Sequence, residues 1–306
     1  MQYTIRQAIT VPNLGRPSAA ARGTRPPRTA LGFTRLELAI VMVVLALLFT
    51  TLLSGLTRFG TQSRTFQCLN NLHQLTLAWR EYTEDNQDKL LYASSSTTAP
   101  PPISSLPVWV NGAMDYDGAN RSNWDPAYNI FRSPMWPYCT NAYEIWRCPS
   151  DPSYVIFNGV ARPRVRSISM NVYLGGFEGT DGGWGWSSQF RLFLKATDLT
   201  APGPAKTFVF PEMRPDSINW PDFQTEMSGY PNQPALYQFN TDYPNMLHDL
   251  ACNFSFADGH AETHRWLDPR TVPAFVPQQQ LPIGPIIAAP GDPDIAWLQD
   301  HATRPK

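Results

Sequence analysis

The sequence predicts an α+β chain in which a long N-terminal helix precedes a head of short antiparallel strands and long loops. Twelve consecutive apolar residues, from Leu38 to Phe49, open the helical part, and apolar residues then recur every three or four positions as far as Tyr82. Thirty Pro and nineteen Gly in 306 residues favour turns over further long helices. The order of helix first and strands after is typical of an α+β fold.

Composition narrows the possible functions. Hydrophobic residues make up 42% and charged residues 16% of the chain, which is not the composition of a disordered protein. The net charge of −1 gives no electrostatic basis for nucleic-acid binding. Neither a phosphate-binding G-x-x-x-x-G-K-[ST] loop nor a G-x-S-x-G nucleophile turn occurs. We therefore expect neither an enzyme nor a nucleic-acid partner.

The first part of the chain has the pattern of a membrane anchor. Residues 1–32 contain five Arg and no acidic residue, and form a basic leader. The apolar stretch extends more weakly to Leu56, about 28 Å of helix, which is close to the ~30 Å core of a bilayer. We expect residues 33–57 to span the membrane once, with the N-terminus in the cytoplasm and the head outside. A cleaved secretory signal is the alternative, but no clean small-x-small site follows the run.

One carboxylate lies at the start of this apolar run. Glu37 is the fifth residue counted from Phe33, and Gly32 precedes Phe33. An ionisable residue in an apolar helix is costly and marks function by default. Cleavage after Gly32 would leave a positive amine at Phe33, which Glu37 of a neighbouring copy could neutralise. Glu37 would then set the register between subunits.

Residues 58–86 continue the helix as an amphipathic half. The apolar stripe that we expect to lie on the head is Phe66, Leu69, Leu72, Leu75, Trp79 and Tyr82. Acidic residues crowd the end of the segment, where the helix dipole disfavours them. Termination near Asn86 is predicted, because Asn tolerates the left-handed cap conformation.

Residues 87–306 are predicted to form the β-rich head. Short runs of strand-forming residues are bounded by Gly, Pro, Asn or Asp, as expected for an antiparallel sheet with irregular connections. The predicted strands cover 108–111, 143–147, 165–173, 190–194, 207–210, 252–256 and 260–266.

A histidine cluster near the C-terminus is the first candidate metal site. Strand alternation places His260, Glu262 and His264 on one face, with His248 and Asp258 nearby. Imidazoles and a carboxylate are zinc ligands, so zinc is a possible cofactor, although none is required. The alternative is a hairpin that turns at Asp258, because Asp-Gly between apolar runs is a strong hairpin signal, with His248 bonded to that turn.

A second candidate is a calcium site at Asp115 and Asp117, followed by a Gly turn. Their oxygens suit Ca²⁺, but the spacing is not that of an EF-hand, and ordinary turn carboxylates are the alternative.

Tryptophans and cysteines leave further alternatives open. The run GGWGW at 182–186 is typical of aromatic platforms that stack on sugars, but ten Trp also supply core material. Cys68, Cys139, Cys148 and Cys252 permit more than one disulfide pairing, and a buried Cys68 is also expected as a packing residue.

The N-terminal pattern resembles the type III signal of type IV prepilins and type II secretion pseudopilins. Their pattern is a basic leader, Gly, Phe-Thr, a Glu five residues into the mature chain and about twenty apolar residues. The resemblance implies a pilin-like fold, prepilin peptidase cleavage at Gly32–Phe33, N-methylation of Phe33 and an assembly role for Glu37. Arg35 departs from the family, which usually has an apolar residue there.

The head resembles a family of pseudopilin-like proteins with a His-nine-Asp-Gly motif, matched by His248 and Asp258. Scattered blocks from 32 to 271 carry the likeness. It implies a structural subunit of a type II secretion or type IV pilus-like fibre at the inner membrane. The implied partners are prepilin peptidase, other pilin or pseudopilin subunits, the inner-membrane assembly platform and the lipid bilayer. The alternative function is a membrane-anchored, extracytoplasmic carbohydrate-binding or metal-dependent hydrolytic module.

Overall fold

The structure is a computed structural model that describes residues 34–95, 106–240, 242–282 and 286–306, with the backbone alone for 50–61. The leader 1–32 and the predicted cleavage pair Gly32–Phe33 lie outside these residues. The chain divides into two compact units, Met1–Leu53 and Ser54–Lys306. The division falls within helix α1, which is continuous from Arg35–Asp85 over 51 residues.

The start of α1 is built as a capping box. The Thr34 backbone N–H donates to Glu37 Oε2 at 2.8 Å, and the Glu37 N–H donates to Thr34 Oγ1 at 3.2 Å. This reciprocal pair satisfies two amides that a helix start would otherwise leave unbonded. The hydrogen bond from the Thr34 amide holds the pKa of Glu37 below its usual value. Residues 34–37 have the T-x-x-E sequence that is typical of such a cap.

The expected membrane crossing is corrected. Among the residues that the structure describes, no helix is long and apolar enough to cross a membrane. The uninterrupted apolar run, Leu38–Phe49, covers only about 18 Å at 1.5 Å per residue, against a ~30 Å bilayer core. The expectations of a transmembrane segment over 33–57, of a single-pass location in the inner membrane and of a membrane-anchored prepilin are therefore wrong.

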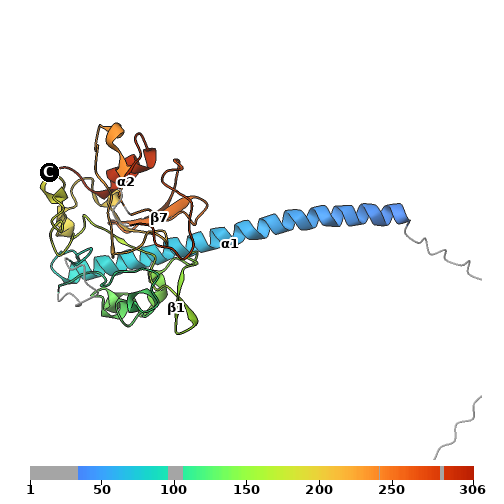
Figure 1. Ribbon diagram of the computed structural model, residues 1–306, viewed down its shortest axis with the longest axis horizontal. Coiled ribbons are helices and arrows are strands. Elements are labelled where there is room, and N and C mark those ends of the chain that lie inside the picture. The colour runs from blue at the N-terminus through green and yellow to red at the C-terminus, as the bar shows by residue number, and fades with distance from the viewer. Residues whose placement is uncertain (1–33, 96–105, 241, 283–285) are drawn as a thin grey trace, which may run out of the picture. The chain divides into compact units, whose positions relative to one another are not determined.

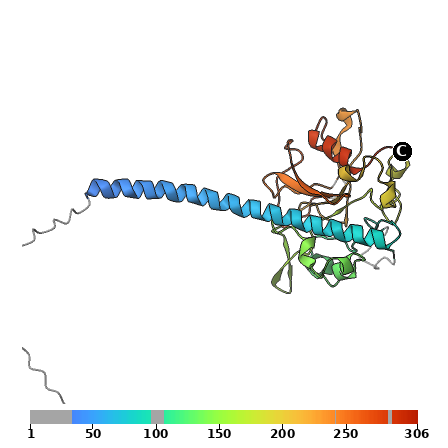
Figure 2. The same cartoon turned by 180° about the vertical axis from the view of Figure 1, so that it is seen from behind.

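The C-terminal half of α1 packs one face against the head and leaves the other face exposed. Figures 1 and 2 show this half, in cyan, with β1 on one side and β7 and α2 on the other. Leu72, Leu75 and Trp79 are buried as the predicted stripe requires, whereas Phe66 is exposed. Cys68 is buried in its place, so the buried face of the helix is rotated slightly at its entry to the head.

Helix α1 ends at Asp85, one residue before the predicted stop. Gln87 and Asp88, rather than Asn86, adopt positive φ angles of 60° and 68°. The Asp88 N–H donates to the Thr83 carbonyl at 3.0 Å, and the Asn86 side chain donates to the Tyr82 carbonyl at 2.7 Å. Side chain and backbone together satisfy the last carbonyls of the helix.

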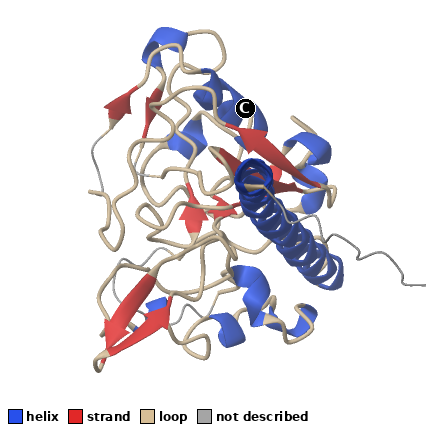
Figure 3. Ribbon diagram, turned by 90° about the vertical axis from the view of Figure 1, so that its right-hand side faces the viewer, coloured by secondary structure: helices blue, strands red, loops and turns tan. Residues whose placement is uncertain are grey.

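The expected pilin-like fold, with the helix packed on an antiparallel β-sheet head, is also corrected, because the strands form four small sheets among loops (Figure 3). The central sheet has the order β4-β7-β8 and is antiparallel, whereas β3 and β5 pair in parallel. Antiparallel pairs β1-β2 and β6-β9 complete the described sheets. The strands are β1 Tyr154–Phe157, β2 Val160–Pro163, β3 Met170–Asn171, β4 Phe208–Pro211, β5 Asp222–Phe223, β6 Gln238–Phe239, β7 Ala251–Phe256, β8 Ala261–Arg265 and β9 Ile287–Ala288.

A short helix replaces one of the predicted strands. Residues 143–147 were expected to be a strand, but Tyr143–Trp146 forms the 3-10 helix η4. It brings Trp146 against Trp109, with the rings stacked 5.2 Å apart in the core. The last helix, α2 Pro293–Ala302, starts where the Asp292 side chain accepts from the amides of Asp294 and Ile295. The other 3-10 helices are η1 Arg121–Asn123, η2 Ile130–Arg132, η3 Trp136–Tyr138, η5 Trp186–Ser188, η6 Ala196–Asp198, η7 Pro204–Lys206 and η8 Pro234–Leu236.

Candidate metal centre

Four buried side chains with metal-binding atoms meet beneath α1. Cys68, Cys148, Glu212 and His248 offer ligand atoms that all lie within 4.8 Å of one another. None of the four residues is more than 4% exposed. This buried Cys/Glu/His cluster could hold a metal ion. No other group of three or more such side chains comes together among the described residues.

Each ligand comes from a different part of the chain. Cys68 belongs to α1, Cys148 follows η4, Glu212 directly follows β4, and His248 precedes β7. The Glu212 N–H donates to the Asn253 carbonyl at 3.1 Å, which extends the β4-β7 pairing by one residue. The Cys148 N–H donates to Ser167 Oγ at 2.6 Å. Backbone hydrogen bonds thus fix two of the four ligands.

The distances inside the cluster suit a small tetrahedral ion. His248 Nε2 lies 3.3 Å from Cys148 Sγ and 3.0 Å from Glu212 Oε2. The Cys68 thiol donates to Glu212 Oε1. In a tetrahedral zinc site the bond lengths place neighbouring ligand atoms about 3.3–3.8 Å apart. The two His248 contacts would have to change by only a few tenths of an ångström to become metal bonds, whereas the Cys68 thiol and Glu212 Oε1 would have to move apart by about 1 Å.

A second layer of hydrogen bonds orients the ligands. Thr65 lies one turn before Cys68 on α1, and its Oγ1 is 3.0 Å from His248 Nδ1, which leaves Nε2 facing the cluster. The Asn253 amide and the Asn245 side chain donate to Glu212 Oε2 at 3.2 and 3.3 Å. Such outer contacts set the tautomer and direction of metal ligands.

The electrostatics of the cluster without a metal are those of a buried ion pair. Burial opposes ionisation of Glu212, but the hydrogen bonds from His248 outweigh it and lower the pKa of the carboxyl. Burial also disfavours the imidazolium, yet contacts with Cys148 and Glu212 raise the pKa of His248 to about 10. Burial raises the pKa of the Cys68 thiol. A metal ion would displace the protons of the thiols and of Nε2.

The predicted histidine cluster separates in the structure. His248 joins the buried cluster, whereas Glu262 and His264 lie on β8 and His260 lies directly before this strand. The β7-β8 hairpin predicted at Asp258 is confirmed, with Gly259 N–H donating to the Phe256 carbonyl at 2.9 Å.

The surface residues of that hairpin have partners of their own. His260 Nδ1 lies 2.6 Å from Asp258 Oδ1 in an exposed pair. His264 stacks on Trp297 with 3.9 Å between the ring centroids. His248 does not bond to the hairpin turn, since its ring nitrogens contact Thr65, Cys148 and Glu212.

The predicted calcium carboxylates lie in a loop where local donors satisfy them. Asp115 accepts from the Asp117 amide at 2.9 Å and from Asn123 Nδ2 at 2.7 Å. Asp117 Oδ1 accepts from the Ala119 amide at 2.9 Å. Neither residue belongs to the described metal-binding group.

Sequence reasoning missed Cys68, Cys148 and Glu212 as ligands. All four cysteines are buried and free, so none of the pairings left open by the sequence forms here. The spacing of the four ligands, 68, 148, 212 and 248, matches no local metal motif. The one sequence signal was His248 itself, in the His-nine-Asp-Gly motif.

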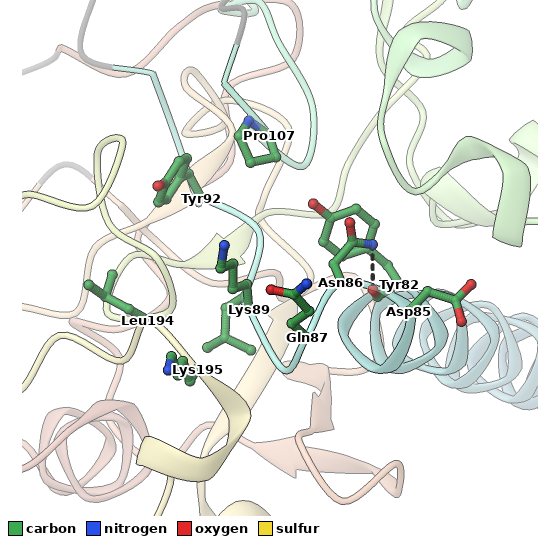
Figure 4. Close-up of a pocket in the computed structure, with 10 residues that line it drawn as sticks. Tyr82, Asp85, Asn86, Gln87, Lys89, Tyr92, Pro107, Leu194 and Lys195 are labelled. Carbon is green, nitrogen blue, oxygen red and sulfur yellow. Dashed lines mark hydrogen bonds between the residues drawn. The ribbon is translucent and has the colours of Figure 1, made fainter.

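The described residues also line a cleft of about 570 Å³ at the end of α1 (Figure 4). Tyr82, Asp85 and Asn86 come from the helix end. Lys89 lies in the turn that follows the helix, and Lys195 lies directly before η6. Asn86 turns back to the Tyr82 carbonyl, as the dashed line in Figure 4 shows. The Asp85 carboxylate accepts from the Tyr138 hydroxyl at 3.1 Å. The Asn86 contact caps the helix and the Asp85 contact joins it to Tyr138, so neither residue is turned toward a ligand.

No protein-family model matches the chain, and no curated protein or solved structure matches it.

Proposed function

We propose that this protein is a non-enzymatic structural subunit that associates with further copies of itself through the first turns of α1, as the resemblance implies for pilin-like fibre subunits. The observation that carries the proposal is the apolar surface of α1. Leu36, Ile40, Met42, Val43 and Phe49 are each between 55% and 72% exposed. Exposed apolar surfaces of this extent mark interaction sites.

Helix packing explains why copies of the chain are suitable partners. The run Leu38–Phe49 has no polar face, so it can be buried on all sides only within a group of helices. Each fully buried Leu, Ile, Val or Phe side chain contributes about 1.5–3 kcal/mol. Several such contacts per helix would hold a fibre together.

Processing at Gly32 belongs to the same proposal. A prepilin peptidase would cut before Phe33 and methylate its amine, and Glu37 of a neighbour would pair with that amine. Glu37 lies on the first turn and is exposed, which supports its availability to a neighbour. Its capping bonds to Thr34 would then compete with that intersubunit pair.

Association can be tested on the full chain with Ile40→Asp. A charge at this position is expected to abolish higher-order species in sedimentation velocity and chemical cross-linking, because it would have to be buried between helices. Leu267→Asp is the matched control, since Leu267 is 72% exposed in the head. Intact mass spectrometry of the natively expressed protein is expected to give the methylated chain from Phe33. Equal association of Ile40→Asp and wild type would overturn the proposal.

We further propose zinc, rather than calcium, as the ion of the buried cluster. Two thiols and an imidazole are soft or borderline ligands that suit Zn²⁺, whereas Ca²⁺ takes six to eight oxygens. Four protein ligands complete a tetrahedral zinc shell without an open position, which is the pattern of structural rather than catalytic sites. The burial of all four residues supports this role over a metal-dependent hydrolase.

Metal content of the purified full chain tests the zinc proposal. We expect one zinc per chain, and Co²⁺ substitution is expected to give thiolate-to-cobalt charge-transfer absorption. Cys148→Ser should remove both signals. Cys139→Ser is the control, because Cys139 is equally buried but lies outside the cluster. Absence of stoichiometric zinc after growth in zinc-supplemented medium would exclude the ion.

A further inference from the structure

A second cleft, of about 510 Å³, lies in the head and shares no residue with the metal centre. Both aromatic and polar side chains line its walls. The aromatic members are Tyr173, Trp184, Trp186, Phe190 and Tyr230, and the polar members include Gln189, Gln224, Thr225, Glu226 and Asn240. Concave sites with a few convergent polar groups among aromatic rings are typical ligand sites.

Trp184 presents an open aromatic face at this cleft. It is 59% exposed, yet its ring packs against buried Phe177 with 5.6 Å between centroids. A large aromatic side chain held so far into solvent gives up apolar burial that a core position would supply. A ligand with a flat apolar face would recover it.

The loop that carries Trp184 is firmly built. Asp181 accepts hydrogen bonds from the Gly183 amide at 3.0 Å, the Ser187 amide at 3.2 Å and the Ser187 hydroxyl at 2.8 Å. Gly185 has φ = 82°, which favours glycine between the two tryptophans. The indole of Trp184 is therefore held in place without a bound ligand, which limits the entropy cost of binding.

Two polar atoms of cleft residues have no hydrogen-bond partner among the described residues. They are Thr225 Oγ1 and Trp186 Nε1, and Thr225 is only 3% exposed. An unpaired buried polar atom costs about 1–3 kcal/mol. The indole N–H needs an acceptor and the threonine hydroxyl can use either, so hydroxyl groups match both atoms.

The charge of the lining excludes anions. Of the described residues that line the cleft, none is Lys, Arg or His, and the one acidic residue is Glu226. Glu226 Oε1 accepts from the Ser228 amide at 3.1 Å and from its hydroxyl at 2.7 Å. Asn240 Nδ2 donates to Gln224 Oε1 at 3.0 Å. Such carboxamides both donate and accept, which suits neutral, hydroxyl-rich ligands better than phosphates.

We propose that this cleft binds a neutral oligosaccharide. A pyranose ring lays its apolar C–H face on Trp184, and small side-chain rotations bring its hydroxyls to Thr225 Oγ1 and to the indole N–H of Trp186, both of which are buried in the unliganded protein. The binding is non-covalent and requires neither the metal ion nor association through α1. It extends the proposed structural role by giving the head a surface for polysaccharide.

Native affinity electrophoresis of the full chain tests this binding. The gels contain barley β-glucan, hydroxyethylcellulose, xylan or glucomannan, which are neutral and soluble. We expect retardation in at least one gel, and Trp184→Ala should weaken the apparent Kd about tenfold or more, the equivalent of about 1.4 kcal/mol. Tyr154→Ala is the matched control, because Tyr154 is a 40% exposed aromatic residue on β1, outside the cleft.

A second variant separates polar recognition from stacking. Thr225→Val keeps the shape of the side chain and removes the hydroxyl, and it should weaken binding severalfold while near-ultraviolet circular dichroism stays unchanged. Migration unaffected by all four polysaccharides would overturn the proposal. Equal retardation of Trp184→Ala and Tyr154→Ala would overturn it too.

Discussion

Two histidine-bearing regions of the head contrast with each other. On the surface hairpin, His260 directly before β8 and His264 within β8 are four residues apart, but each contacts its own neighbour, Asp258 or Trp297. In the interior, His248 meets Cys68, which is 180 residues away in the sequence, together with Cys148 and Glu212. Closeness in sequence produced no cluster, whereas tertiary packing did. Burial decides the difference, because a buried polar group must find a partner and an exposed one has water.

The largest expected loss of stability comes from a substitution in the buried cluster. Glu212→Ala removes the carboxylate paired with His248 and is expected to lower the free energy of unfolding by about 3–5 kcal/mol in metal-free protein, because an unmatched buried charge remains. Urea denaturation would measure this. Glu262→Ala, at an exposed position of β8, is the matched control and should cost less than about 0.5 kcal/mol. Similar losses of unfolding free energy in the two variants would contradict the difference between the buried cluster and the surface hairpin.

Asp222 is a buried carboxylate without a histidine partner, and it can be compared with Glu212 of the buried cluster. Burial raises the pKa of Asp222 to about 6, although Arg166 partly offsets it. Because the folded-state pKa exceeds the unfolded value of about 3.8, the folded state binds more protons in this interval, and stability falls as pH rises from about 4 through 6. The expected loss is about 1–3 kcal/mol.

Asp222→Asn is expected to flatten that part of the pH–stability curve, measured by thermal denaturation between pH 4 and 7. Asp249→Asn serves as the control, because Asp249 lies in an exposed ion pair. An unchanged slope in Asp222→Asn would show that Asp222 is not the group that titrates.

A smaller effect is expected on the surface hairpin at His264. Its ring stacks on Trp297 and meets the edge of Trp266 at 5.0 Å, so His264→Ala should cost about 1 kcal/mol of stability through lost aromatic contact. Zinc content should not change. Loss of zinc in His264→Ala would show that the surface hairpin contributes to metal binding, against the separation from the buried cluster seen in the structure.

The smallest effect is expected for the exposed pair. Asp258→Ala removes the partner of His260 and should change stability by less than about 1 kcal/mol, since exposed ion pairs contribute little. Raising the salt concentration should reduce even this difference in thermal denaturation. A loss of stability of several kcal/mol that does not depend on salt would contradict this prediction and show that the pair is important for the fold.

The sequence predicted the features that depend only on residues close together in the chain. The apolar spacing of Leu72, Leu75 and Trp79 predicted the buried face of α1, and the Asp-Gly pair predicted the β7-β8 hairpin. The expected membrane crossing of the first half of that helix was wrong, as was the single antiparallel sheet. The parallel pairing of β3 with β5 joins residues that are 52 positions apart, and no local residue pattern specifies it.

The candidate metal centre was harder to predict for the same reason. His248 was noted for its motif, but the motif joined it to Asp258 and strand alternation added His260, and both of these residues lie on the outside of the hairpin. The other candidate ligands, Cys68, Cys148 and Glu212, follow no common period because three separate segments supply them. Only the packing of α1 against the central sheet brings their side chains together.

The separation of those ligands along the chain has a consequence for biosynthesis. Cys68 leaves the ribosome long before His248, so the four donors cannot all be present until most of the polypeptide has been made. Contacts between such distant segments form slowly, because the intervening loop must close first. Metal loading would therefore be a late step of maturation, and truncated translation products would expose two unligated cysteines to other metals or to oxidants.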